Sequence, residues 1–99
     1  LESHQYPNDF KLNQNYPNPF NPTTNIKYEI ITGKFVKIEI YDLKGNYVKN
    51  LVNDYKMPGQ YEVQWDALDH LSREVSAGVF IYTISSNSKA LSKKMLFVK

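Results

Sequence analysis

The sequence contains no cysteine, which excludes disulfides and thiolate metal sites and leaves packing as the source of stability. Its hydrophobic runs stay far below the roughly 20 residues that a membrane-spanning helix requires. No stretch repeats its apolar residues at a period of about 3.6, so we expect almost no helix. The 99 residues carry a net charge of +2, which gives no indication of nucleic-acid binding. The composition predicts one domain with a modest core.

Patterns that indicate catalysis or metal binding are also scarce. The four glycines fall in predicted turns or at strand starts, which leaves none for a phosphate-binding loop. No serine has the surroundings of a nucleophile elbow, and the two histidines lack metal-ligand spacing. We therefore predict no enzyme activity, no cofactor and no bound metal.

A weak calcium site around Asp66 and Asp69 is an alternative that stays open. Asp42 and Asp54 are further carboxylates that such a site could use. The segment lacks the alternating oxygen ligands and the central glycine of an EF-hand loop. The simpler interpretation is that Asp66 accepts hydrogen bonds from the backbone of its own turn.

Aromatic residues are abundant, at 14% of the chain, and they support two interpretations. Most fall at inward positions of predicted strands, which indicates core and cross-strand packing. A coplanar exposed set would instead form a sugar-binding surface. The rings that we expect at the surface are Phe35, Tyr41, Tyr47 and Tyr55. A carbohydrate-binding or adhesive accessory domain is therefore the alternative function.

Apolar and polar residues alternate with a period of two along most of the chain, which predicts β-strands. The predicted strands cover residues 25–30, 36–40, 46–52, 61–65, 79–85 and 90–98. Turn signals separate them at residues 32–34, 42–45, 57–60 and 85–88. This pattern predicts an all-β fold, an Ig-like antiparallel β-sandwich of about seven strands.

Several details of the sandwich follow from the same pattern. Val48 and Leu51 are an odd spacing apart, which predicts a bulge in that strand. Strand 79–85 is apolar in both registers, so we expect burial on both faces. The predicted core contains Trp65, Tyr28, Ile38, Ile40, Val63 and Tyr82.

Residues 15–24 combine stiffness with large aromatics. Three prolines within six residues fix φ and remove backbone donors, which excludes a helix. A disordered linker would rarely carry Tyr16 and Phe20 so close together. We predict an ordered segment whose two aromatics pack onto the sandwich and close one edge or end.

The last strand is basic. Residues 89–99 contain four lysines and no acid, so this segment has a charge of +4. Since the whole chain has a net charge of +2, the remaining residues have a net charge of −2. Lysines on an edge strand protect it against unwanted pairing. A partner-facing role is the other interpretation.

Five motifs occur in order over residues 10–99. They are Asn15–Thr24 followed by Ile26-Lys27-Tyr28; Ile40–Gly45 with Val48 and Leu51; Gly59-Gln60-Tyr61 with Val63, Trp65 and Asp66; Ala77–Phe80 with Tyr82; and Lys93–Lys99. In this order they resemble the type A C-terminal sorting domains of the type IX secretion system. A related Ig-like fold occurs in flagellar hook-capping proteins, so a structural domain of a flagellar cap is a third hypothesis.

The resemblance implies a function that the composition does not. Residues 1–9 would be a linker from a larger upstream protein, and residues 10–99 a non-catalytic Ig-like sorting domain. It would direct its cargo from the periplasm through an outer-membrane translocon to the cell surface or the medium. In many members a sortase-like peptidase then removes the domain and joins the cargo to lipopolysaccharide. We expect these partners, no nucleic acid and a monomeric state.

The resemblance also assigns residues to two roles. The residues that would form the structural motifs are Tyr16, Pro17, Pro19, Phe20, Asp42, Gly45, Gly59, Trp65 and Gly78. The residues that would be recognised by the translocon are Lys93, Lys94, Met95, Leu96, Val98 and Lys99. Backbone pairing at the exposed edge of this last strand is the expected mode of recognition.

The chain departs from the family pattern at one loop. Members often carry glycine after the Trp-Asp pair and an Asp-Asn-Gly-like turn shortly after it. Here Ala67 and His70-Leu71-Ser72 take these places. Since alanine and leucine disfavour positive φ, we predict a different backbone geometry in this loop.

Overall fold

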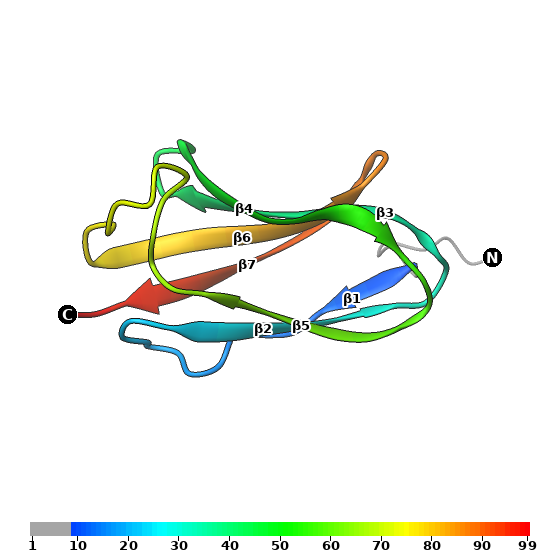
Figure 1. Cartoon of the computed structure of the whole chain (residues 1–99), viewed down its shortest axis with the longest axis horizontal. Coiled ribbons are helices and arrows are strands. Elements are labelled where there is room, and N and C mark those ends of the chain that lie inside the picture. Colours follow the sequence, from blue (N-terminus) through cyan, green and yellow to red (C-terminus); the bar gives the residue numbers. More distant parts are fainter. Residues whose placement is uncertain (1–8) are drawn as a thin grey trace.

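The computed structural model describes residues 9–99. These residues form seven strands: β1 (Phe10–Leu12), β2 (Thr24–Ile30), β3 (Lys34–Asp42), β4 (Tyr47–Lys56), β5 (Gly59–Trp65), β6 (Gly78–Ser86) and β7 (Lys89–Phe97). One antiparallel sheet has the order β1-β2-β5 and the other the order β4-β3-β6-β7. Figure 1 shows the two sheets as facing layers. The predicted all-β sandwich is confirmed.

The described part of the chain contains no helix, and thus none that is long and apolar enough to cross a membrane. The six predicted strands are all present, most of them longer than predicted. The sequence pattern does not predict the seventh strand, β1, because three residues are too few to show a period. Phe10 and Leu12 are nevertheless buried, and β1 pairs with the end of β2.

The first described residue already belongs to the fold. Asp9 accepts a backbone hydrogen bond from Ile31 (2.8 Å). Its carboxylate pairs with Lys34 and, at 3.0 Å, with Lys89. The rest of the expected linker, residues 1–8, lies outside the described residues.

The predicted bulge in β4 is confirmed, and a second one accompanies it. In the pairing of β3 with β4, Ile38 faces Val52 but Glu39 faces Asn50, which leaves Leu51 without a partner. A second shift between Ile40 and Tyr41 leaves out Val48 in the same way. The bulge at Leu51 lets this side chain pack against the core although it lies an odd number of positions from the buried Val48 and Val52.

The core lies between the sheets and contains five of the six predicted residues. Val63 is the exception, since it is half-buried at the margin of the core. In β6, Phe80, Tyr82 and Ile84 are buried, whereas Val79, Ile81 and Thr83 on the other face are half-buried. The prediction that this strand is buried on both faces is wrong, because neither sheet has a third layer over it among residues 9–99.

The predicted turn at residues 42–45 is confirmed. The Gly45 amide donates to the Asp42 carbonyl (3.0 Å), and Gly45 has φ of +88°. The Asp42 carboxylate accepts hydrogen bonds from the amides of Lys44 and Asn46, both at 2.9 Å. Asp42 and Gly45 therefore stabilise the turn of the β3–β4 hairpin, which is the structural role that the resemblance assigned to them.

The prediction of a different geometry in the loop after β5 is wrong at Ala67. Ala67 has φ of +64° and Ser72 has φ of +63°, so both occupy the left-handed region without being glycine. This conformation costs about 1–2 kcal/mol per residue. Hydrogen bonds from Val75 to the Ala67 carbonyl (3.0 Å) and from Ser72 to the Asp69 carbonyl (2.9 Å) offset that cost.

Candidate functional site

The residues assigned to recognition lie at the end of β7 and directly after it, and β7 is one of the two edge strands of the four-stranded sheet. Met95 and Phe97 point inward and are buried. Lys94, Leu96 and Val98 point to the outer face, where Leu96 is 37% and Val98 39% exposed. Lys93 is half-buried on the inner side and Lys99 is exposed at the chain end. The recognition set is thus divided between two faces of one strand.

Residues 15–24, the proline segment, cover together with Gln14 the outer backbone edge of this half of β7. The Phe20 amide donates to the Leu96 carbonyl, and the Val98 amide donates to the Phe20 carbonyl, both at 3.0 Å. The Asn18 side chain accepts from the Leu96 amide (2.9 Å), and the Gln14 side chain donates to the Lys94 carbonyl (2.7 Å). The expectation that the edge of the last strand is unpaired is therefore wrong from Lys94 to Val98.

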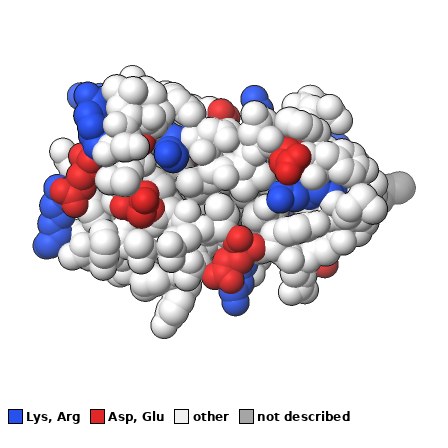
Figure 2. Space-filling model, in the orientation of Figure 1, with Lys and Arg blue, Asp and Glu red and all other residues white. Residues whose placement is uncertain are grey.

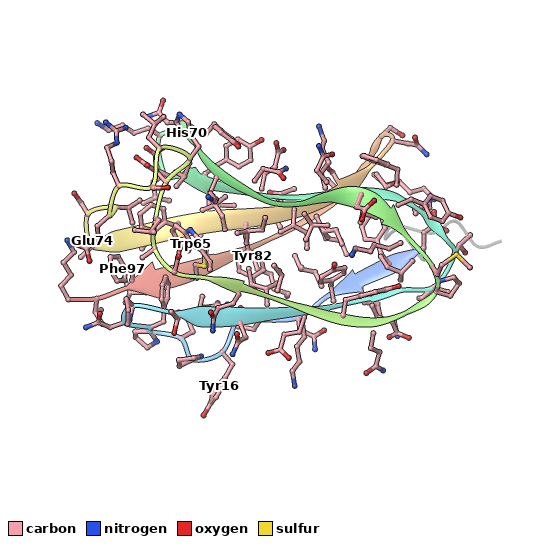
Figure 3. All side chains as sticks on the ribbon, viewed as in Figure 1. Tyr16, Trp65, His70, Glu74, Tyr82 and Phe97 are labelled. Carbon is pink, nitrogen blue, oxygen red and sulfur yellow. The ribbon has the colours of Figure 1, made fainter. Side chains whose placement is uncertain are left out.

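Phe20 anchors the proline segment in the core, as predicted. Its ring lies 5.7 Å from Trp65 and 5.2 Å from Phe97, and Trp65 in turn lies 5.3 Å from Phe80. The four rings come from four different motifs, so the aromatic cluster joins motifs that lie far apart in the sequence. Figure 3 shows Trp65 and Phe97 between the two sheets.

The corresponding prediction for Tyr16 is wrong. Its side chain is 79% exposed and points away from the molecule (Figure 3). The Tyr16 backbone forms two hydrogen bonds of 2.9 Å with Asn25, and this pairing directs the side chain outward. Tyr16 therefore contributes its backbone to the fold and leaves its ring available at the surface.

A buried polar network, which the sequence analysis missed, fixes the start of the proline segment. The Tyr82 hydroxyl donates to the Asn13 carbonyl (2.7 Å) and accepts from the Asn15 amide (2.8 Å). The Asn15 side chain donates to the Thr24 hydroxyl (2.9 Å), which donates to the Pro17 carbonyl (2.8 Å). The only available signal was that polar Asn15 and Thr24 flank the aromatics and prolines.

Burial raises the pKa of Tyr82 to about 12, because the ionised form would lose its hydration. The stabilisation from the neutral hydroxyl is complete below pH 10, the ordinary pKa, and is lost as the pH rises toward 12. We expect the melting temperature to fall in this range.

Tyr82→Phe should cost about 1–3 kcal/mol at pH 7, since it leaves the Asn15 amide unpaired. As the pH rises above 10, this variant should lose less stability than the wild type. If the melting temperatures of the two proteins fell in parallel with pH, the stabilising role of the neutral Tyr82 hydroxyl would be contradicted.

The carboxylates considered for calcium serve their own loops. The amides of Asn46 and Lys44 lower the pKa of Asp42, and those of Arg73 and Leu71 lower the pKa of Asp69. The Asp66 carboxylate accepts from the Leu68 amide (3.2 Å), as the simpler interpretation predicted. Among residues 9–99, no three His, Asp or Glu side chains come together as a metal site.

The four aromatics expected at the surface form two separate cross-strand pairs, and Tyr41 among them is half-buried, not exposed. Phe35 pairs across strands with Tyr55, and each ring is more than half exposed. Tyr41 and Tyr47 form the other pair, with ring planes inclined by 71°. The two pairs lie six positions apart along β3, which corresponds to about 20 Å. The four rings thus do not form the coplanar surface that sugar binding was expected to require.

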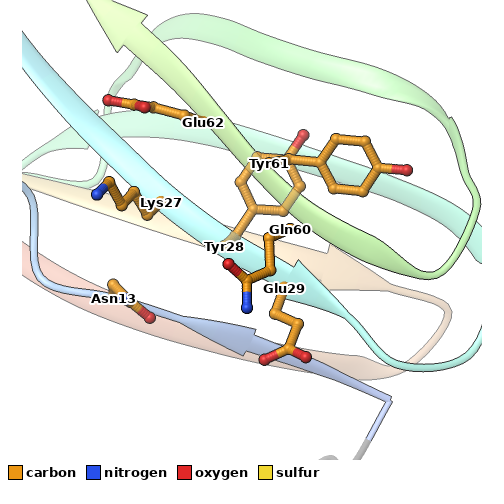
Figure 4. A pocket seen from close by; sticks show the side chains of 7 residues that line it. All are labelled: Asn13, Lys27, Tyr28, Glu29, Gln60, Tyr61 and Glu62. Atoms are coloured by element: carbon orange, nitrogen blue, oxygen red, sulfur yellow. The ribbon is translucent and has the colours of Figure 1, made fainter.

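A shallow hollow of about 360 Å³ lies on the outer face of the three-stranded sheet (Figure 4). Lys27, Glu29, Gln60 and Glu62 stand around it. It offers charges of both signs but no cysteine, serine or histidine. On the side of the molecule drawn in Figure 2, positive and negative side chains are likewise interspersed.

The family model of the secretion system C-terminal sorting domain matches residues 14–99. The chain belongs to this family. The match includes the proline segment, the Trp65 motif and the last strand, whose rings meet in the aromatic cluster. No curated protein matches the chain in sequence.

Solved structures share the fold at low sequence identity. PorU from Porphyromonas gingivalis is 20% identical with a TM-score of 0.71, over 90% of this chain and 9% of PorU. PorZ, a surface component of the type IX secretion system of the same species, is 17% identical with a TM-score of 0.62, over 87% of this chain and 11% of PorZ. FlgD from Xanthomonas campestris, a hook-capping protein, is 20% identical with a TM-score of 0.59, over 92% of this chain and 63% of FlgD.

The chain thus spans about a tenth of the length of PorU and PorZ. It is a sorting module of the type IX secretion system, and the protein that carries it is exported to the cell surface or the medium. The family is defined by sorting and not by a reaction. The likeness to FlgD reflects the shared sandwich.

Proposed function

We propose that this chain performs no catalysis and directs a larger, covalently joined cargo from the periplasm through the type IX outer-membrane translocon. The residues before Asp9 connect it to that cargo. The domain acts as a monomer, and a sortase-like peptidase is its second partner. The family match over residues 14–99 supports this proposal.

The recognition surface in this proposal is the outer side of the last strand, formed by Lys94, Leu96, Val98 and Lys99. The observation that carries it is the clamp of residues 14–20 on the β7 edge. Because the clamp fixes the backbone, it holds these side chains in one arrangement before a partner arrives, which lowers the entropic cost of binding. Lys93 supplies charge on the inner side, and Met95, buried at 2% exposure, fixes the register.

The test is a cargo fusion in a host with the secretion machinery. The double variant Leu96→Ser with Val98→Ser removes the apolar part of the recognition surface and leaves Met95 and Phe97 in place. We expect this fusion to accumulate in the periplasm, measured by fractionation. Lys94→Gln should cause only partial loss, because peripheral charges mainly change the association rate.

The matched control is Phe35→Ser with Tyr55→Ser, which removes two exposed apolar side chains from other strands of the same sheet. This fusion should be delivered like the wild type, and thermal melting should show that both double variants fold. Normal surface delivery of a folded Leu96→Ser, Val98→Ser fusion would refute the assignment of the recognition surface.

A further inference from the structure

The sandwich has four edge strands, and they are not protected equally. β1 has three residues, β4 has two bulges and carries Lys49 and Lys56, and β7 is covered by the proline segment over its last residues. β5 pairs with β2 over seven residues without a register shift and contains no lysine, no proline and no bulge. Long, regular edges without such devices readily pair with another strand.

The backbone groups on the free side of β5 can be identified from β2. Asn25 and Lys27 direct their backbone groups to the chain before β2, since they bond to Tyr16 and Asn13. The alternate residues of β2 therefore face β5, where their partners are Gly59, Tyr61, Val63 and Trp65. It follows that Gln60, Glu62 and Gln64 direct their amides and carbonyls away from the sheet. Among residues 9–99, no backbone hydrogen bond outside the β2–β5 ladder involves these groups.

A groove runs beside this edge, between β5 and β4. It has a volume of about 380 Å³ and is lined on its inner side by Leu51, Tyr61 and Val63, which are half-buried. An added strand would direct alternate side chains toward this lining and the others toward the outer face. The edge and the groove together provide both parts of strand addition, which are backbone pairing and pockets for alternate side chains.

The charges beside the edge favour a basic partner. Glu62 and Asp54 are exposed at the groove, and neither forms an ion pair within the described residues. Within residues 9–99, Lys56 is the one cation that lines the groove, and its ammonium lies over the Tyr61 ring, 5.1 Å from the centroid. A second copy of β5 fits poorly, since antiparallel pairing centred on Glu62 places two carboxylates opposite each other.

We propose that the free edge of β5 is a docking site for an extended segment of another protein. This segment adds antiparallel to Gln60–Gln64, places apolar side chains against Val63 and Leu51, and carries lysine or arginine opposite Glu62. The site is separate from the last strand and does not depend on its recognition by the translocon.

The test is a titration of the full chain, labelled with ¹⁵N, with a short capped peptide in which valine alternates with lysine. We expect shift changes concentrated at residues 60–64, and hydrogen exchange slowed at least about tenfold at the amides of Gln60, Glu62 and Gln64. Glu62→Pro removes an outward donor without touching the β2–β5 ladder, so it should weaken binding at least about tenfold. Glu62→Gln, the matched control, should weaken it only about two- to threefold.

A second peptide tests the proposal without altering the protein. The same sequence with N-methyl groups on alternate amides cannot pair with an edge and should not bind. Equal binding of this peptide, or of Glu62→Pro, overturns the proposal. The proposal is also overturned if the shift changes lie on β7, or if excess peptide causes no shift changes. Self-association of the chain through β5 without peptide would overturn it as well.

Discussion

Trp65→Ala is expected to lower the free energy of unfolding by about 3–5 kcal/mol. Trp65 is 1% exposed, and its ring contacts Phe20 and Phe80 at the centre of the aromatic cluster. The substitution leaves a cavity between the sheets and removes the 2.9 Å hydrogen bond from the indole to the Leu68 carbonyl. Urea unfolding at pH 7 measures the loss.

Leu71→Ala is the control for Trp65→Ala. Leu71 follows in the next loop but is 59% exposed, so its truncation should change stability by no more than about 0.5 kcal/mol. If Trp65→Ala unfolded at the same urea concentration as the wild type, the aromatic cluster would not be the source of stability that its geometry indicates.

Phe20→Ala should destabilise the domain by a similar amount, about 3–5 kcal/mol, although Phe20 lies outside every strand. The ring is 1% exposed and fills the space between Trp65 and Phe97. Its loss should also release the clamp on β7, because the Phe20 backbone provides two of the hydrogen bonds to that edge. Faster hydrogen exchange at Val98 would report this release.

Tyr16→Ala is the matched variant, since it truncates an aromatic four positions away in the same segment. With 79% of the Tyr16 side chain exposed, the effect on stability should stay within about 0.5 kcal/mol. Equal effects of the two substitutions would show that the segment is held by its backbone and not by the Phe20 ring.

The alternation of apolar and polar residues was sufficient to predict six strands, the sandwich and most of the core. It could not reveal β1, because three residues contain less than two periods. It also gave no information on which residues of the proline segment face inward, since this segment follows neither a strand nor a helix period. The backbone pairing of Tyr16 with Asn25 decides that question, and it is a tertiary contact.

The candidate site was predictable in position but not in geometry. The lysines and the resemblance pointed to residues 93–99, and the structure places them at the end of an edge strand and directly after it. The clamp by residues 14–20 joins segments about 80 residues apart, such as Gln14 and Lys94, and no local pattern encodes such a contact. The left-handed Ala67 shows the same limit, because burial and hydrogen bonds outweigh the conformational preference of alanine.

The most direct measurement of the sorting role is whether the domain is sufficient to export a foreign protein. A periplasmic reporter joined through residues 1–8 to residues 9–99 should reach the surface or the medium of a host with the type IX machinery. The reporter without the domain should remain in the periplasm, and so should the fusion in a host without the translocon. Retention of the intact, folded fusion in the periplasm of the competent host would contradict the role of this chain as a sorting module.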